Sequence, residues 1–266
     1  MAAASPRLRA IGRKWRNSRE ALAPVAVIVA LLIAWQLGVD WFSVPVYLLP
    51  SPTRIVGAVW AVAGEVAAHA GATLLTIFAG FLLSILTALP LAAVLTLSAT
   101  ARAAIYPLLV LSQSIPKVAL APILVLVLGT NILPRIMVTF LVAFFPLVIA
   151  TAAGLSATPR ELIELGRSLQ ATRLKELFRI RLPFAIPFVF SGLKMAITFS
   201  VIGAVVGEFV AADRGLGYLM TSSLAFFNTP LGYGAIVILS LLAIVLFQTV
   251  VVLESILFPW SARMRT

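Results

Sequence analysis

The sequence predicts an all-α membrane protein with six transmembrane helices. The mean hydropathy is +1.11, and only 11% of the residues are charged. Apolar runs longer than the roughly 18 residues that a helix needs to cross a bilayer recur along the chain. The chain has no cysteine, which excludes disulfides and thiolate metal sites.

The chain begins with a basic segment, residues 1–20, followed by an apolar run over residues 21–39. The run is too long for a secretory signal and lacks a cleavage site of small residues, so we interpret it as a retained span. The basic segment has little apolar material for a core. It is predicted to be a cytoplasmic tail that lies close to anionic membrane lipid.

Residues 53–68 carry an apolar face, with the charged Arg54 and Glu65 toward its ends. This pattern predicts a helix that lies on the outer membrane surface. Five further spans are predicted at residues 71–97, 103–128, 135–155, 184–210 and 232–258. A single membrane domain, residues 21–260, therefore holds all six spans, and residues 261–266 form a cytoplasmic tail.

The basic residues indicate the orientation of these spans. Fifteen of the twenty lie in segments on the side of the two termini, three lie on the opposite side, and two fall within spans. Positive charge is enriched in the cytoplasmic loops of membrane proteins, so both termini are predicted to be cytoplasmic. The same distribution argues against nucleic-acid binding, which a net charge of +11 would otherwise suggest.

Residues 158–187 form the one long polar segment after the N-terminal tail, and they hold six basic residues. Thr158, Pro159 and Glu161 predict a helix start with a capping box. The leucines that follow recur at helical spacing, which predicts a short amphipathic helix.

A second short helix is predicted over residues 173–180, with Leu174, Leu177 and Phe178 on one face. It is expected to end at Pro183, because proline lacks the donor that would continue the helix. Two short amphipathic helices between two spans predict a docking surface for a soluble partner.

The polar segment resembles the EAA loop of ABC-importer permeases, which has a leading glutamate, a later glycine and a terminal Ile-x-Leu-Pro. Aligned on residues 180–183, the leading position falls on Glu164, followed by Leu165 and Gly166. Gln170 occupies the position of the family's glycine, a departure because glycine would permit a positive φ there.

Shorter motifs narrow the resemblance to the nitrate/sulfonate/taurine branch, which includes permeases for riboflavin and thiamine-precursor pyrimidines. These motifs are Leu48-Leu49-Pro50-Ser51-Pro52, Gly192-Leu193-Lys194, Gly207-Glu208-Phe209 and Arg214-Gly215-Leu216-Gly217-Tyr218-Leu219. The resemblance runs over residues 47–260.

This resemblance implies a type I ABC-importer permease fold with a cytoplasmic coupling helix and no catalytic activity. Its coupling loop, residues 157–183, is expected to contact a separate ATPase that binds ATP and magnesium. The chain has no Gly-x-x-x-x-Gly-Lys-Ser/Thr motif, and no cofactor or metal is expected in it. The expected coupling residues are Glu161, Glu164, Leu165, Gly166, Leu169, Gln170, Ala171 and Thr172.

The resemblance also implies two copies of the permease around a pathway, an extracytoplasmic binding protein, and a location in the bacterial inner membrane. The expected cargo is a small anion, such as a sulfonate or nitrate, or a heterocycle, such as riboflavin or a thiamine-precursor pyrimidine. The alternative is an ion-coupled secondary transporter, which would need two matching inverted halves with acidic groups at mid-membrane. An intramembrane protease would need a buried Ser–His pair or two aspartates in spans. Neither accounts for the polar segment.

Pro116 and Pro122 predict a break in the span at residues 103–128, because each removes a backbone donor. The carbonyls freed by a break need water or protein beside them. The break is either part of the translocation path or its gate, or a structural kink whose lysine reaches a membrane interface. The candidate path residues here are Ser112, Gln113, Pro116 and Lys117.

Lys194 and Glu208 also fall within a predicted span, where a charge at the helix centre costs at least ~2.5–3.5 kcal/mol. They lie roughly 21 Å apart by helical rise and cannot pair with each other. Each is expected either to line the path or to pair with a neighbouring helix or subunit. His69, the sole histidine, has no partner set for metal binding or nucleophilic catalysis and is expected to be structural.

Overall fold

The computed structural model describes residues 6–260, and all regular structure within them is helical. The α-helices are α1 (Pro6–Trp41), α2 (Pro52–Ala61), α3 (Ala63–Leu97), α4 (Ala99–Ser112), α5 (Ala121–Leu128), α6 (Ile132–Ser156), α7 (Arg160–Ser168), α8 (Arg173–Glu176), α9 (Leu182–Ala211), α10 (Leu216–Ala225) and α11 (Thr229–Leu257). A 3₁₀ helix, η1 (Lys117–Leu120), precedes α5, and a π-helix, η2 (Leu177–Arg181), joins α8 to α9.

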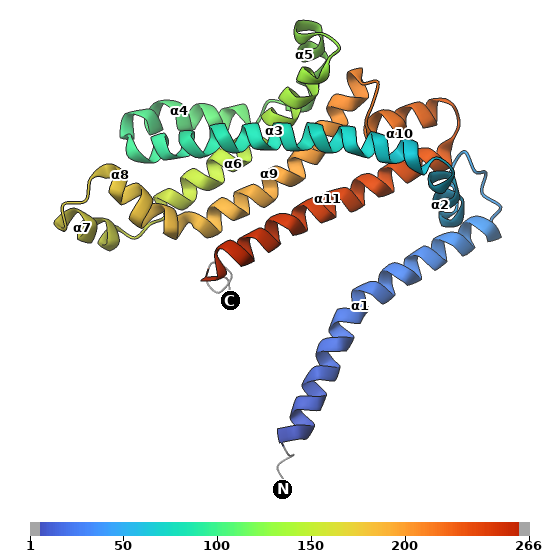
Figure 1. Cartoon of the computed structure of the whole chain (residues 1–266), viewed down its shortest axis with the longest axis horizontal. Coiled ribbons are helices and arrows are strands. Elements are labelled where there is room, and N and C mark those ends of the chain that lie inside the picture. The colour runs from blue at the N-terminus through green and yellow to red at the C-terminus, as the bar shows by residue number, and fades with distance from the viewer. Residues whose placement is uncertain (1–5, 261–266) are drawn as a thin grey trace.

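Four long helices, α3, α6, α9 and α11, form the central bundle (Figure 1). α6 packs along both α3 and α9, and α11 packs on α9 and α10. α9 lies close to α6 at Gly203 and Gly207, where an added Cβ would lie 2.7 Å from the Cα of Thr139 and 2.9 Å from the Cα of Arg135. Small residues permit such close packing between membrane helices.

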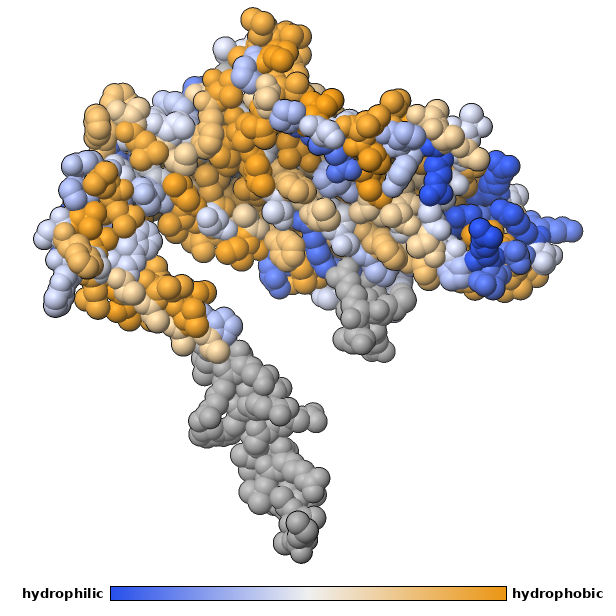
Figure 2. All heavy atoms as spheres, turned by 180° about the vertical axis from the view of Figure 1, so that it is seen from behind, coloured by the Kyte–Doolittle hydropathy of each residue, from blue (hydrophilic) through white to orange (hydrophobic). Residues whose placement is uncertain are grey.

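Among the described residues, five helices are long and apolar enough to cross a membrane. The bent pair formed by α4 with η1 and α5 adds a sixth if it counts as one span. The predicted all-α fold is therefore confirmed, and the predicted six spans are reached when the bent pair counts as one span. Figure 2 shows apolar side chains over the middle of the molecule and hydrophilic ones gathered at the end that carries α7 and α8.

The predicted interfacial helix at residues 53–68 is wrong in its second half. α2 ends at Ala61, and the chain breaks at Val62 before α3 begins at Ala63. Between Val62 and Pro90 there is no proline, so no residue of this kind separates positions 63–68 from the rest of α3. Residues 63–68 therefore extend the second span, and α2 alone is the short helix at this end.

α1 stands apart from the bundle and meets it near α2 (Figure 1). The amide and hydroxyl of Thr53 donate to the Gln36 side chain, at 3.2 and 3.3 Å, which ties the end of α1 to the start of α2. Apolar side chains farther back along α1 are exposed, Leu31 by 65% and Ile33 by 53%. The helix extends back to Pro6, so residues 6–20 of the predicted tail continue it. The other predicted tail segments, residues 1–5 and 261–266, lie outside the described residues.

Candidate functional site

The polar loop begins without the predicted capping box. α7 starts at Arg160, and Pro159 takes the N-cap position, where no side chain caps the helix. The Thr158 hydroxyl donates instead to the carbonyl of Leu155, at 3.3 Å. The predicted cap is wrong, because the hydroxyl binds the end of the preceding helix, α6. The first amides of α7 are therefore left to bind solvent.

The end of α7 forms a tight turn around Gln170. The Ala171 amide donates to the Gly166 carbonyl and the Gln170 amide to the Arg167 carbonyl, each at 2.9 Å. These two bonds define a Schellman motif, in which the residue after the cap adopts a left-handed conformation and is usually glycine. Gln170 has a φ of +56°. The backbone geometry that glycine would permit is thus present, although the residue is glutamine.

The second short helix does not end at Pro183, and that prediction is wrong. Thr172 caps α8 by accepting from the Lys175 amide at 3.3 Å, and the chain then passes through η2 directly into α9. Pro183 lies in the first turn of α9, where a missing amide donor does little harm. The wider π turn of η2 absorbs the change that the proline requires.

A buried carboxylate, Glu176, holds the loop against the bundle. Its Oε1 accepts from Arg181 at 2.6 and 2.8 Å, and its Oε2 lies 3.4 Å from the Nε of Arg167. Arg181 also donates to the carbonyl of Leu155 at 3.1 Å, so the network reaches the end of α6. Glu176 was not among the predicted residues. The signal was available, because it is the only acid among the basic residues at positions 173–181.

The loop also exposes a set of large apolar side chains, which we call the docking face. Its members are Leu162, Leu165, Leu169, Leu174 and Phe178, with exposed fractions between 43% and 75%. The exposed carboxylates Glu161 and Glu164 lie on the same helix, α7. Leu177 was predicted to share this face, but it is buried, because η2 turns it inward. An exposed apolar patch with charged neighbours is typical of a protein–protein contact.

The predicted break in the third span is present. α4 ends at Ser112, and the helix axis turns by 85° before η1 and α5 continue it. Lys117 folds back across the break, where its Nζ donates to the Ser112 carbonyl at 3.1 Å and lies 4.7 Å from the centre of the Phe145 ring. Gln113 and Pro116 are exposed. A polar side chain exposed at this depth needs water or protein beside it, as a path or a subunit contact would provide.

The Glu208 carboxylate is buried at the opposite end of the bundle, where it caps α10. Its Oε2 accepts from the Gly217 amide at 2.7 Å, and its Oε1 accepts from the Thr73 hydroxyl at 2.8 Å. Thr73 in turn accepts from the Leu216 amide at 2.8 Å. These contacts favour the structural interpretation of Glu208. Thr73 was not among the predicted residues.

Lys194 forms an ion pair with Glu254, which joins α9 to α11. Both side chains are largely buried, at 12% and 5% exposure. The pairing with a neighbouring helix is one of the two expected arrangements. Lys194 and Glu208 thus have separate partners within one chain, and a role of either in the path remains a prediction.

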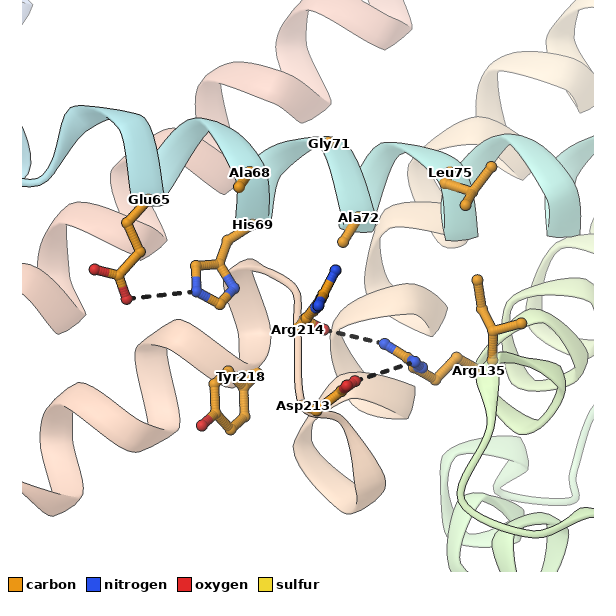
Figure 3. Close-up of a pocket in the computed structure, with 11 residues that line it drawn as sticks. Glu65, Ala68, His69, Gly71, Ala72, Leu75, Arg135, Asp213, Arg214 and Tyr218 are labelled. Atoms are coloured by element: carbon orange, nitrogen blue, oxygen red, sulfur yellow. Dashed lines mark hydrogen bonds and ion pairs between the residues drawn. The ribbon is translucent and has the colours of Figure 1, made fainter.

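An open pocket of about 670 Å³ lies between the start of α3, the start of α6 and the turn before α10 (Figure 3). Arg135 reaches into it, donating to the Arg214 carbonyl at 3.0 Å and lying 3.7 Å from Asp213. His69 stacks on Tyr218, and its Nδ1 accepts from the Gly215 amide at 3.0 Å.

The turn before α10 depends on glycine. Gly215 has a φ of +126°, and a Cβ there would collide with the Glu208 carboxylate. The structural role expected for His69 agrees with its bond to this turn. Among residues 6–260 no cluster of three or more metal-ligating side chains occurs.

The fold and these sites define a membrane transport subunit, with an apolar bundle, a broken span and an exposed polar loop. The chain belongs to the family of binding-protein-dependent transport system inner membrane components, whose model matches residues 80–261. It is therefore an ABC-importer permease.

Relatives match the chain over nearly its whole length. It is 38% identical to the formylaminopyrimidine transport permease protein ThiX of Halalkalibacterium halodurans, over 93% of this chain and 99% of the relative. It is 35% identical to the riboflavin transport system permease protein RibX of Chloroflexus aurantiacus, over 97% and 96%. It is 25% identical to the taurine transport system permease protein TauC of Escherichia coli, over 95% and 94%.

Proposed function

We propose that this permease imports a small solute, delivered by an extracytoplasmic binding protein, using the energy of a separate ATPase that binds ATP and magnesium. The main support for this proposal is the docking face. It exposes five large apolar side chains on a loop that Glu176 holds rigidly from below. A rigid, exposed loop between two spans can transmit the closure of a soluble motor to the bundle.

The ATPase is expected to contact the loop through the predicted coupling residues. Leu165 and Leu169 are exposed, whereas Gly166 packs inward against Ile180. Gln170, Ala171 and Thr172 form the turn that fixes α7 relative to α8. Glu161 and Glu164 add negative charge beside the leucines, which gives the contact electrostatic specificity.

Two copies of the chain are proposed to surround the pathway in the bacterial inner membrane, with both termini in the cytoplasm. The arm formed by α5 projects from the bundle (Figure 1), with Leu126 86% exposed and Val127 72% exposed. Such an arm is suited to packing against a second copy around a twofold axis. The polar groups at the break between α4 and η1 would then line the path between the copies.

The cargo is proposed to be a small heterocycle. The two relatives above with more than 30% identity are named for formylaminopyrimidine and riboflavin, whereas the one named for taurine is 25% identical. The pocket between α3, α6 and α10 lies beside the segment that we propose meets the binding protein, residues 211–230. His69 and Tyr218 there present stacked aromatic rings.

Glu164→Arg tests the docking assignment. Reversing this exposed charge is expected to abolish uptake while the protein still inserts in the membrane, because the ATPase contact loses its complementary charge. Radiolabelled uptake in cells and co-purification of the ATPase are the measurements. Asp40→Arg, which reverses an exposed carboxylate on α1, is the matched control and should leave uptake intact. Normal uptake and normal ATPase association in Glu164→Arg would overturn the assignment.

A further inference from the structure

A second, strongly basic pocket lies beneath the polar loop and has no role in the proposed transport cycle. Its volume is about 250 Å³, and it opens between the end of α3, the start of α4 and the loop. Four arginines line it, together with the single carboxylate of Glu176. The arginines are Arg102, Arg167, Arg173 and Arg181.

These charges do not cancel. Glu176 is already shared between Arg181, which is 13% exposed, and Arg167. Arg173 donates to the Leu97 carbonyl at 3.3 Å, and Arg102 lies 6.0 Å from the centre of the Tyr106 ring. Within residues 6–260, neither Arg102 nor Arg173 forms an ion pair with a carboxylate. The pocket therefore carries an excess of positive charge.

The helix that starts at the pocket adds to this field. α4 begins at Ala99, which lines the pocket, and runs for 14 residues away from it. The N-terminus of a helix carries partial positive charge and exposed amides, which favour an anion. Ser98 satisfies one amide of this first turn by accepting from Ala101 at 3.2 Å.

We propose that this pocket binds one phosphate group, held mainly by Arg102, Arg167 and Arg173. Guanidinium groups bind phosphate oxygens through paired, charge-assisted hydrogen bonds. The phosphate comes either from the head group of an anionic phospholipid or from soluble phosphate at the membrane surface.

The position in the fold favours the lipid. Leu97 is the last residue of the α3 span, so the pocket lies at the level where a span meets the head groups. Leu108 and Leu111, farther along α4, are 63% and 66% exposed and extend apolar surface toward the membrane interior. Basic pockets between spans at a membrane surface bind anionic head groups in this way. A bound phosphate would link Arg102 of α4 to Arg173 of the loop and so stiffen the loop.

The test uses the purified complex of permease and ATPase in detergent. Its unfolding temperature is followed as phosphatidylglycerol, phosphatidylcholine or inorganic phosphate is added, and half-saturating concentrations are compared. Arg102→Gln with Arg173→Gln is expected to weaken the phosphatidylglycerol effect about thirtyfold, or roughly fivefold for each charge removed. Arg160→Gln removes an exposed arginine outside the pocket and should leave the effect unchanged.

Each outcome decides the proposal. A phosphatidylglycerol effect that weakens in the double glutamine variant, and that Arg102→Lys with Arg173→Lys largely restores, supports a lipid phosphate. An inorganic phosphate effect with the same pattern supports a soluble phosphate. Equal responses to phosphatidylglycerol and phosphatidylcholine, without any phosphate effect, would overturn the proposal, as would an undiminished effect in the double glutamine variant. Normal ATPase co-purification shows that the variants fold, and Glu164→Arg tests the docking face separately.

Discussion

At the scale of single residues, the loop between α6 and α9 depends on two side chains with opposite energetic roles. Gln170 stores strain, because its φ of +56° places a side chain in a conformation that glycine adopts freely. Glu176 relieves the cost of burying Arg181 by accepting two of its hydrogen bonds. Each role leads to a prediction.

Gln170→Gly is expected to stabilise the loop by about 0.5–1 kcal/mol, because the left-handed strain of about 1–2 kcal/mol is partly offset by the backbone freedom of glycine. Hydrogen exchange at the Ala171 amide, which bonds to Gly166, should slow accordingly. Gln170→Ala is the control, since alanine keeps the strain and should give no gain. Faster exchange in the glycine variant would contradict this account of the turn.

Glu176→Gln is expected to destabilise the loop by roughly 3 kcal/mol, because the charge of Arg181 stays buried without its carboxylate. Hydrogen exchange over residues 166–181 should become faster, and ATP hydrolysis by the complex should no longer depend on cargo. Glu161→Gln removes an exposed carboxylate from the same loop and should leave exchange there unchanged. If both variants exchange alike, Glu176 does not hold the loop.

At the scale of elements, the broken third span is the least regular part of the membrane bundle. The break frees carbonyls at the end of α4, and Lys117 satisfies one of them from the far side of the turn. The side chain of Asn131 joins the two neighbouring helices, donating to the Leu128 carbonyl and accepting from the Leu133 amide, each at 2.7 Å. Side chains thus fix both ends of the arm formed by η1 and α5.

Lys117→Met is expected to slow uptake about tenfold and to alter selectivity, because a hydrogen bond from a charged donor is worth ~1.5 kcal/mol or more. The uptake rates of the cargo and of a competing solute measure both effects. Arg54→Met removes an exposed positive charge from α2 and serves as the control. If neither the uptake rate nor the selectivity changes, Lys117 has a structural role and is not part of the path.

At the scale of the whole molecule, two parts of the chain project from the bundle with apolar surfaces uncovered. α1 exposes apolar side chains over residues 25–37, and α5 does so on a short arm (Figure 1). Within the bundle, a buried ion pair between Lys194 and Glu254 joins α9 to α11. The projecting arm of α5 is therefore the part of the chain on which the proposed second copy can be tested.

Leu126→Cys tests whether a second copy of the chain packs against α5. The chain has no cysteine, so a single introduced thiol reports only on its own position. We expect it to cross-link two copies in native membranes through a short bifunctional reagent, because we propose that α5 packs against the second copy. Ile244→Cys on α11, which is 63% exposed, gives the background rate. Cross-linking of both variants at the same rate would argue against a contact through α5.

The family, the membrane spans and the broken helix could all be predicted from the amino-acid sequence. These follow from local properties, because apolar run length sets a span and proline removes a backbone donor wherever it occurs. The polar loop was also predictable, since its charge and helical spacing are local.

Which side chains contact one another became visible only in the folded molecule. Glu176 reaches Arg181 because η2 is a π turn, and the Glu208 carboxylate reaches Gly217 because α3 supplies Thr73 beside it. Packing also decides that the Thr158 hydroxyl binds the last turn of α6. It decides the left-handed conformation of Gln170 in the same way. Contacts between residues far apart in the chain are set by the bundle as a whole, and no local pattern encodes them.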